Sequence, residues 1–443
     1  MSYASAASGP QRRLDLPILP VLPRKRGMFI NYFAGFGGLA QAAREALGYP
    51  PHFNANHADI AVQVHDLNFP EGLALRCDVR DIDPVRDIPA GPVEAAWFSP
   101  DCRHFSDAKN AKPLDKGIRG LAWIALRVAA KRRPGVIFLE NVPGFLKWGP
   151  LNRSHRPIKK KQGVTFARFV SQLRDLGYVV EWRVLDAADF GTPSFRERLV
   201  LIARCDGKPI GWPTPTHGPG RRRPYIAAET CIEWDRPVRS IFDRGKLPAL
   251  KSQERIAVGI KRFVLSRPPL IRNGLAWCGF VRGYGERPGQ ETRTLDLAGP
   301  LHTIVAGGVK DGLVAVWLIK HYTGVFGVPL SAPMGTITAR DHHALGAVYL
   351  TRERQEQTEA WLRSMLGDID LTVRHEGETW RIADVGTRML APTELLRGMG
   401  FPTDFRLVGT QEQQIAGVGN AVPIPLGAAV LRANLPQNWR AAA

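Results

Sequence analysis

The feature that most constrains the fold is a regular alternation of buried strands and amphipathic helices along residues 28–205. Short apolar runs, typical of strands buried on both faces, alternate with segments in which apolar residues recur at helical spacing. The expected strands are Met28–Ala34, Ala95–Phe98, Val136–Leu139, Val179–Leu185 and Leu199–Ala203, and the expected helices are Leu39–Leu47, Ile118–Ala130 and Phe166–Leu176. This order favours an α/β fold with a mostly parallel sheet.

The pattern changes after Cys205. Residues 206–225 are rich in Pro, Gly and Arg, which suggests a linker, and the strand–helix rhythm stays weak as far as residue 383. Helical patterning returns after residue 384. We therefore predict a mobile basic arm at 1–26, a first domain at 27–205, a smaller irregular domain at 206–383, and a C-terminal segment at 384–443 that completes the first domain.

The charge balance indicates a polyanionic partner. The chain carries 60 Lys and Arg against 41 Asp and Glu, a net charge of +19. Four basic clusters contribute to it: Arg24–Arg26, Lys131–Arg133, Lys159–Lys161 and Arg221–Arg223. One such cluster can be merely a solvated face, but four in a chain this basic favour contacts with nucleic-acid phosphates.

Cysteine spacing and hydropathy exclude other classes. The five cysteines include no Cys-x-x-Cys pair, so we expect no metal site and no redox pair, and one thiol is free to be reactive. The apolar run Leu14–Leu22 is broken by prolines and is followed, not preceded, by basic residues, so it does not read as a signal peptide. No run approaches the roughly 18 apolar residues of a membrane span. We expect a cytoplasmic protein with no membrane contact.

Four segments carry residues suited to chemistry, and three of them directly follow an expected strand. A glycine-rich turn, Phe33–Leu39, opens the first helix, where free N–H groups favour anionic ligands. Cys102 follows the second strand, beside Arg103 and His104, in surroundings that favour a thiolate. Glu140 follows the third strand. Arg196 and Arg198 come just before the last strand, and in an extended chain two residues at this spacing point to the same face.

Taken in this order, the segments resemble the cytosine-5 DNA methyltransferase family. Phe33–Leu39 is similar to that family's S-adenosylmethionine loop, Pro100–Cys102 to its nucleophile loop, Glu140-Asn141-Val142 to its Glu-Asn-Val segment, and Arg196-x-Arg198 to its paired arginines. Arg388, Glu394 and Gly400-Phe401-Pro402 resemble the motif after its recognition domain, and Gly419–Pro423 resembles its closing Gly-Asn-x-Val-Pro motif. The resemblance covers about 28–205 and 384–430.

The resemblance implies a Rossmann-like S-adenosylmethionine-dependent methyltransferase fold with a target-recognition domain at 206–383. Cys102 would add to carbon 6 of cytosine, a protonated Glu140 would donate to ring nitrogen 3, and Arg196 or Arg198 would steady the ring oxygen and the carboxyl group. The implied cofactor-binding residues are Phe33, Gly35, Gly37, Gly38, Leu39, His57, Asp78, Pro100, Asn420 and Val422.

The implied substrate is double-stranded DNA, from which the target cytosine must be flipped out. A polar, basic loop after Cys102 suits closure over the base, and the recognition domain would read base edges in the major groove. The expected DNA-binding residues are Arg103, Ser106, Lys109, Arg119, Arg221 and Arg222. We expect the enzyme to act as a monomer.

Three positions depart from the family pattern. Asp101 separates Pro100 from Cys102, and Ser194 replaces the glutamine that usually precedes the paired arginines. The acidic residue that binds the cofactor ribose is absent, and His57 stands in its place, with Asp59 two residues beyond.

Two other functions fit the same residues. An RNA cytosine-5 methyltransferase would need the same cysteine and glutamate, although the large inserted domain favours sequence reading on DNA. A non-catalytic DNA-binding protein on the same fold is the alternative from another class, and His57 and Asp101 are its best support.

Overall fold

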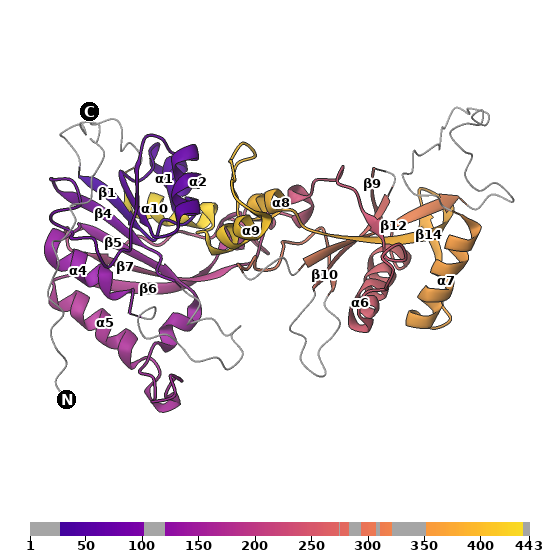
Figure 1. Ribbon diagram of the computed structural model, residues 1–443, viewed down its shortest axis with the longest axis horizontal. Coiled ribbons are helices and arrows are strands. Elements are labelled where there is room, and N and C mark those ends of the chain that lie inside the picture. The colour runs from indigo at the N-terminus through magenta and orange to yellow at the C-terminus, as the bar shows by residue number, and fades with distance from the viewer. Residues whose placement is uncertain are drawn as a thin grey trace.

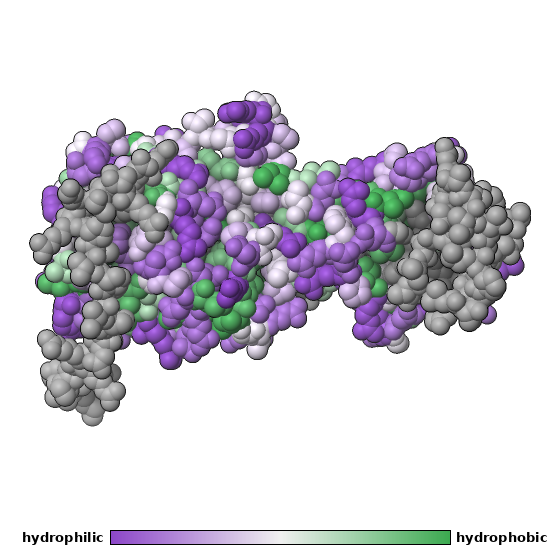
Figure 2. Space-filling model, turned by 90° about the horizontal axis from the view of Figure 1, so that it is seen from above, coloured by the Kyte–Doolittle hydropathy of each residue, from purple (hydrophilic) through white to green (hydrophobic). Residues whose placement is uncertain are grey.

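The computed structural model describes residues 27–101, 120–273, 275–282, 294–306, 311–320 and 351–436. They form two lobes, each built on its own sheet, that lie end to end (Figure 1). Seen from above, the lobes are joined by a narrower waist (Figure 2).

The first lobe contains a sheet with strand order β3-β2-β1-β4-β5-β7-β6. Its strands are β1 (Met28–Tyr32), β2 (Phe53–Asn56), β3 (Leu73–Arg76), β4 (Val93–Phe98), β5 (Val136–Asn141), β6 (Val179–Asp186) and β7 (Glu197–Arg204). The first five pair in parallel, and β7 pairs antiparallel with both β5 and β6. The predicted α/β fold with a mostly parallel sheet is confirmed.

Helices cover both faces of this sheet. One face packs against α1 (Gly38–Leu47), α2 (Asp59–Asn68) and α10 (Ile424–Asn434), and the other against α4 (Trp123–Arg132) and α5 (Val164–Asp175). Successive strand residues alternate between the two cores, so Phe29 belongs to the first and Ile30 to the second. Because both faces are buried, these strands read as continuous apolar runs.

Three elements between β1 and β4 were not predicted from the sequence, namely β2, α2 and β3. The reason is weak patterning. Helix α2 buries only Ala61, Val64 and His65, so it has almost no apolar stripe, and β2 contains two asparagines. The buried Asn54 side chain instead accepts a hydrogen bond from Asn31 of β1 at 2.9 Å.

The C-terminal helices return to the first lobe. The chain passes through α8 (Pro392–Gly398) and α9 (Gln411–Asn420), and α10 then packs on α1, where Arg432 donates to the Glu45 carbonyl at 3.0 Å. Residues Gln411–Asn434 are long and apolar enough to span a membrane, but 67% of the window is buried inside the protein. We interpret them as core helices.

The second lobe is more regular than the sequence suggested. Its sheet has the order β11-β10-β12-β14-β13, with β8 paired to β14 and β9 paired to β10. The strands are β8 (Arg239–Ser240), β9 (Leu270–Arg272), β10 (Leu275–Arg282), β11 (Thr294–Leu295), β12 (Asp311–Lys320), β13 (Thr372–His375) and β14 (Glu378–Met389), and the helices are α6 (Leu250–Ile260) and α7 (Arg352–Leu366). The expectation of an irregular domain does not match this sheet.

The same sheet explains why the pattern was missed. In β12, Val314 and Val316 face the core under α6 and α7, while Leu313 and Ala315 join the core that continues into the first lobe. Both faces are therefore buried, and the strand loses the alternation that marks a half-exposed sheet. Strand β14 also runs unbroken across the predicted boundary at residues 383 and 384, so that boundary lies inside an element.

Candidate active site

The glycine-rich turn lies between β1 and α1. Gly37 has a φ of 85°, in the left-handed region that favours glycine, and a Cβ on Gly38 would lie 2.5 Å from the Val422 carbonyl oxygen. The turn is thus held against the closing Gly-Asn-x-Val-Pro segment, which contributes the buried Val422, while Asn420 ends α9 in an exposed position. Phe33 and Gly35 precede the N-terminus of α1 at Gly38, and Leu39 is buried.

His57 and Asp78 follow the next two strands, at the same edge of the sheet. His57 is exposed directly after β2, and Asp78 lies two residues after β3. Hydrogen bonds from Arg80, and more weakly the nearby charge of His57, hold the pKa of Asp78 below its ordinary value. Asp59 pairs instead with Arg76, at 3.4 Å between Oδ1 and Nη1, so its charge is already partly compensated.

The end of β4 is fixed to the end of β5. The buried Asn141 amide donates to the Pro100 carbonyl at 2.9 Å, and the Trp97 indole donates to Ser99 Oγ at 2.8 Å. The two strands therefore deliver Asp101 and Glu140 to one edge of the sheet. Cys102 itself lies outside the described residues, as do the predicted DNA-binding residues Arg103, Ser106, Lys109 and Arg119.

Glu140 and Arg198 form a buried ion pair. Arg198 Nε lies 2.8 Å from Glu140 Oε1, and each side chain is 9% exposed. The antiparallel pairing of β5 with β7 brings these side chains together. Glu140 of β5 pairs with Val200 of β7, and Arg198 lies two residues before Val200 on the same strand. A buried pair of this kind holds both side chains firmly, because separating them would leave a charge without a partner.

Arg196 points elsewhere. Its guanidinium is buried and donates to the backbone carbonyls of Ile304, Gly419 and Ala421, at 2.5, 2.8 and 3.3 Å. It therefore joins the last strand of the first sheet to the second lobe and to the closing segment. The sequence placed Arg196 and Arg198 on one face, but of the two only Arg198 contacts Glu140 in the structure.

Burial makes three of the other four cysteines poor nucleophiles. It raises the pKa of Cys77 to about 12 and that of Cys231 to about 11, and it also raises the pKa of Cys278. Cys205 Sγ lies 3.3 Å from the Pro134 carbonyl oxygen, a hydrogen-bond contact. No group of three metal-ligating side chains occurs among the described residues.

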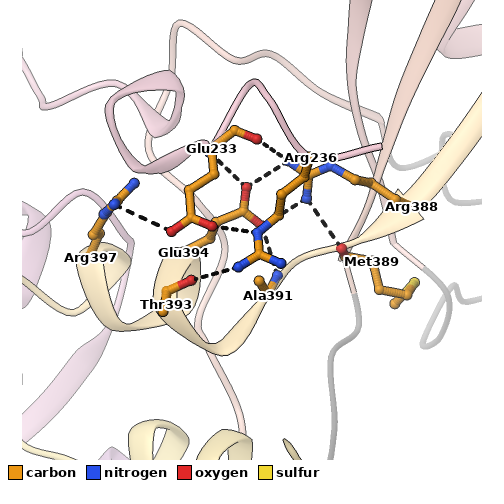
Figure 3. A network of polar contacts seen from close by, with 8 residues as sticks. All are labelled: Glu233, Arg236, Arg388, Met389, Ala391, Thr393, Glu394 and Arg397. Carbon is orange, nitrogen blue, oxygen red and sulfur yellow. Dashed lines mark hydrogen bonds and ion pairs between the residues drawn. The ribbon is translucent and has the colours of Figure 1, made fainter. Parts of the chain in front are cut away.

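A buried ion-pair network joins the two lobes at the start of α8 (Figure 3). Arg388, near the end of β14, makes a bidentate pair with Glu394 at 2.7 and 2.8 Å. Glu394 is fully buried and also accepts from the backbone N–H groups of Ala391 and Glu233. Around it, the Glu233 carboxylate binds Arg236 and Arg397. The sequence identified Arg388 and Glu394 but gave no signal for Glu233.

Replacing Glu394 with glutamine should lower the free energy of unfolding by about 3–5 kcal/mol, because it leaves Arg388 buried without a carboxylate. Urea denaturation followed by tryptophan fluorescence measures the change. Glu356→Gln is the matched control, since its partner Arg352 is 76% exposed and such a surface pair contributes about 0–1 kcal/mol. Equal losses for the two variants would contradict this account of the network.

Residues 206–225, expected to be a linker, include a well-anchored loop. His217 and Arg223 form a β-bridge, and the backbone N–H groups of Thr216 and His217 both donate to the Asp189 carbonyl. Tyr225 closes the loop through a 3.0 Å hydrogen bond to the Asp189 carboxylate. The predicted DNA-binding residues Arg221 and Arg222 are exposed at its turn.

Comparisons with known proteins agree with this arrangement. The family model of C-5 cytosine-specific DNA methylases matches residues 27–221 and 336–435, more than half of the chain. Type II methyltransferase M.SacI of Streptomyces achromogenes is 23% identical over 438 residues, covering 92% of each chain. Type II methyltransferase M.BsuFI of Bacillus subtilis is 30% identical over 179 residues, covering 39% of this chain and 38% of its own length.

Two further comparisons also extend over most of the chain. DNA (cytosine-5)-methyltransferase 1A of Oryza sativa subsp. japonica is 24% identical over 91% of this chain, which spans 28% of that protein. The solved structure of Spodoptera frugiperda DNMT2 superposes with a TM-score of 0.51 at 15% identity, covering 92% of this chain and 99% of that one. The chain thus belongs to the C-5 cytosine-specific DNA methylase family and is a DNA (cytosine-5)-methyltransferase by class.

Proposed function

We propose that this enzyme transfers a methyl group from S-adenosylmethionine to carbon 5 of a cytosine flipped out of a specific duplex DNA site, through a covalent adduct with Cys102. The observation that carries the proposal is the buried Glu140–Arg198 pair, which stands at the end of β5. The neighbouring Asn141 ties that strand to Pro100, two residues before Cys102. An acid and the segment that leads into the cysteine are thus held at one edge of the sheet.

The chemistry explains why these groups are needed together. Carbon 5 of cytosine is a poor nucleophile, but addition of a thiolate to carbon 6 pushes electrons toward ring nitrogen 3, where Glu140, once protonated, would donate a proton. The resulting enamine is nucleophilic at carbon 5 and would accept the methyl group there, leaving the sulfur of the methyl donor as a neutral thioether. Loss of the carbon-5 proton allows the Cys102–carbon 6 bond to break and releases the methylated base.

The two arginines take different roles in this scheme. Arg198 would orient the Glu140 carboxyl group and stabilise charge on the carbonyl oxygen attached to the cytosine ring, because it already lies against Glu140. Arg196 acts as a positioning residue, since its hydrogen bonds reach Gly419 and Ala421, next to the Val422 segment that packs on Gly38.

The residues of the glycine-rich turn fit S-adenosylmethionine, which supplies a sulfonium methyl group when bound. The N-terminus of α1 offers backbone N–H groups to a carboxylate, in line with Phe33, Gly35 and Gly37 as cofactor contacts. Asp78 would accept from the adenine amine. His57 is exposed at the position of the missing acid, so we propose that it contacts the ribose with its ring nitrogens.

DNA would bind between the lobes, with the second lobe reading base edges and the loop that holds Arg103, Ser106, Lys109 and Arg119 closing over the flipped base. Arg221 and Arg222 would contact phosphates from their anchored turn. The bacterial relatives named as type II methyltransferases suggest a restriction–modification context in the cytoplasm.

The test is methyl incorporation from labelled S-adenosylmethionine into duplex DNA and, in parallel, into transfer RNA. We expect label in DNA, and bisulfite sequencing of DNA from cells that express the protein should show one methylated sequence. Label in transfer RNA alone would replace the DNA proposal with the RNA alternative. Wild-type protein that binds duplex DNA but neither binds nor consumes the cofactor would favour the non-catalytic alternative.

A further inference from the structure

A second basic feature lies outside the site described above. Residues 149–163, called the basic hairpin below, connect the segment after Glu140 to α5. They contain no Asp or Glu and five cations: Arg153, Arg156, Lys159, Lys160 and Lys161. In Figure 1 the hairpin projects away from the sheet at the start of α5.

The basic hairpin has a defined backbone. Leu151 and Pro157 form an antiparallel bridge, and the Asn152 N–H donates to the Arg156 carbonyl at 2.9 Å. The Asn152 side chain accepts from the Arg156 N–H, also at 2.9 Å, and closes the turn. A short 3-10 helix, η2 (Lys159–Lys161), then presents the three lysines one after another.

The base of the hairpin is anchored in the first lobe. A Cβ on Gly149 would lie 2.2 Å from the Lys161 carbonyl oxygen, so the two arms meet closely there. Next to it, the buried Trp148 accepts at its carbonyl from the backbone N–H groups of Thr165 and Phe166, at 3.0 and 3.1 Å. The backbone that carries the five cations is therefore ordered before any ligand binds, which lowers the entropic cost of binding.

The anchor also places the hairpin on the substrate side. It is reached from Glu140 through one short 3-10 helix, η1 (Pro143–Lys147). The Trp148 ring packs on Trp123, at 5.1 Å between centroids, and Trp123 begins α4 just after the segment that contains Cys102. The hairpin thus starts at the sheet edge that carries Glu140.

The five cations lack a neighbouring carboxylate partner among the described residues. All are exposed, and none forms an ion pair with a carboxylate in the part of the chain that the structure describes. Because like charges this close repel one another, an external polyanion would bind them strongly. Lysines suit a phosphate backbone, which offers a uniform row of charges and requires no fixed bidentate geometry.

We propose that the basic hairpin binds the phosphate backbone of the duplex flank, outside the recognised site. The inference rests on the proposed DNA function and extends it to residues 149–163, which belong to none of the motifs named above. An extended arm of about six residues spans roughly 20 Å. One turn of the DNA double helix measures roughly 34 Å. The hairpin therefore contacts DNA within about one turn of the flipped base. They add affinity without adding sequence preference.

The experiment compares two variants that lose the same charge. Lys159→Ala/Lys160→Ala removes two cations from the hairpin. Arg174→Ala/Lys208→Ala removes two exposed cations at the opposite sheet edge, where α5 and β7 end, and neither residue belongs to a basic cluster. Dissociation constants are measured against salt concentration, on a duplex of about 40 base pairs that contains the methylated site and on one of about 12 base pairs.

On the long duplex, the hairpin variant should reduce the slope of log Kd against log salt by about 1–2, at about 0.9 per phosphate contact, while the control keeps the wild-type slope. On the short duplex all three proteins should agree. Equal slopes for both variants, or a loss that persists on the short duplex, would overturn the inference. Wild-type protein that binds neither DNA would instead overturn the proposed function, and this inference with it.

Discussion

Cys102→Ser protein should lose methyl transfer by at least about four orders of magnitude in kcat, because a hydroxyl at this position cannot supply the thiolate that activates carbon 5. Its affinity for duplex DNA should stay within a few fold of wild type, since the phosphate contacts are unchanged. Single-turnover transfer of labelled methyl groups measures the first quantity, and a gel-shift titration measures the second.

Cys205→Ser is the matched control for this prediction. Cys205 is only partly buried, and its Sγ lies 3.3 Å from a backbone carbonyl oxygen, so a hydroxyl can replace it with little strain. We expect its kcat within about two- to threefold of wild type, as for a surface substitution. Full activity in Cys102→Ser, or loss of activity in both variants, would remove Cys102 from the mechanism.

Glu140→Gln should lower kcat by about 10²- to 10⁴-fold, the usual contribution of a positioned general acid. Glutamine keeps the shape of the side chain but cannot deliver a proton, and it leaves Arg198 without its anionic partner. Steady-state kinetics on duplex DNA measures the effect, and urea unfolding of the same variant shows how much of the loss reflects stability.

Arg196→Lys provides the comparison. Because Arg196 binds backbone carbonyls near the cofactor turn and does not contact Glu140, its replacement should raise KM for S-adenosylmethionine and change kcat less than Glu140→Gln does. If Arg196→Lys lowered kcat as severely with KM unchanged, the separate roles assigned to the two arginines would be wrong.

The first lobe could be predicted because its strands and helices have strong apolar periodicity. Strands β1, β4 and β5 are buried on both faces and contain mainly apolar residues. Polar or glycine residues at or just after the end of each strand, such as Glu140 in β5, are therefore easy to recognise in the sequence. The α/β fold, the return of the C-terminal helices and the family followed from that pattern and from its motifs. Helix α2 and strand β2 were not predicted because polar residues interrupt their apolar patterns, and β3 was not predicted because it is only four residues long.

The parts that could not be predicted depend on contacts distant in sequence. Arg196 donates to carbonyls that lie more than a hundred residues away in the chain. Because every residue has a backbone carbonyl, the residue types do not reveal such a partner. The same holds for Glu233, whose backbone N–H donates to the Glu394 carboxylate although the two residues lie 161 positions apart. The sheet of the second lobe was hidden for a different reason, since both of its faces are covered.

The most direct test of the central claim is mass spectrometry of the enzyme after incubation with S-adenosylmethionine and duplex DNA that carries 5-fluorocytosine at the target position. Fluorine at carbon 5 cannot leave as a proton does, so the intermediate should stay bonded to the enzyme. We expect a DNA adduct on the peptide that contains Cys102. No adduct, or an adduct on one of the other four cysteines, would contradict it.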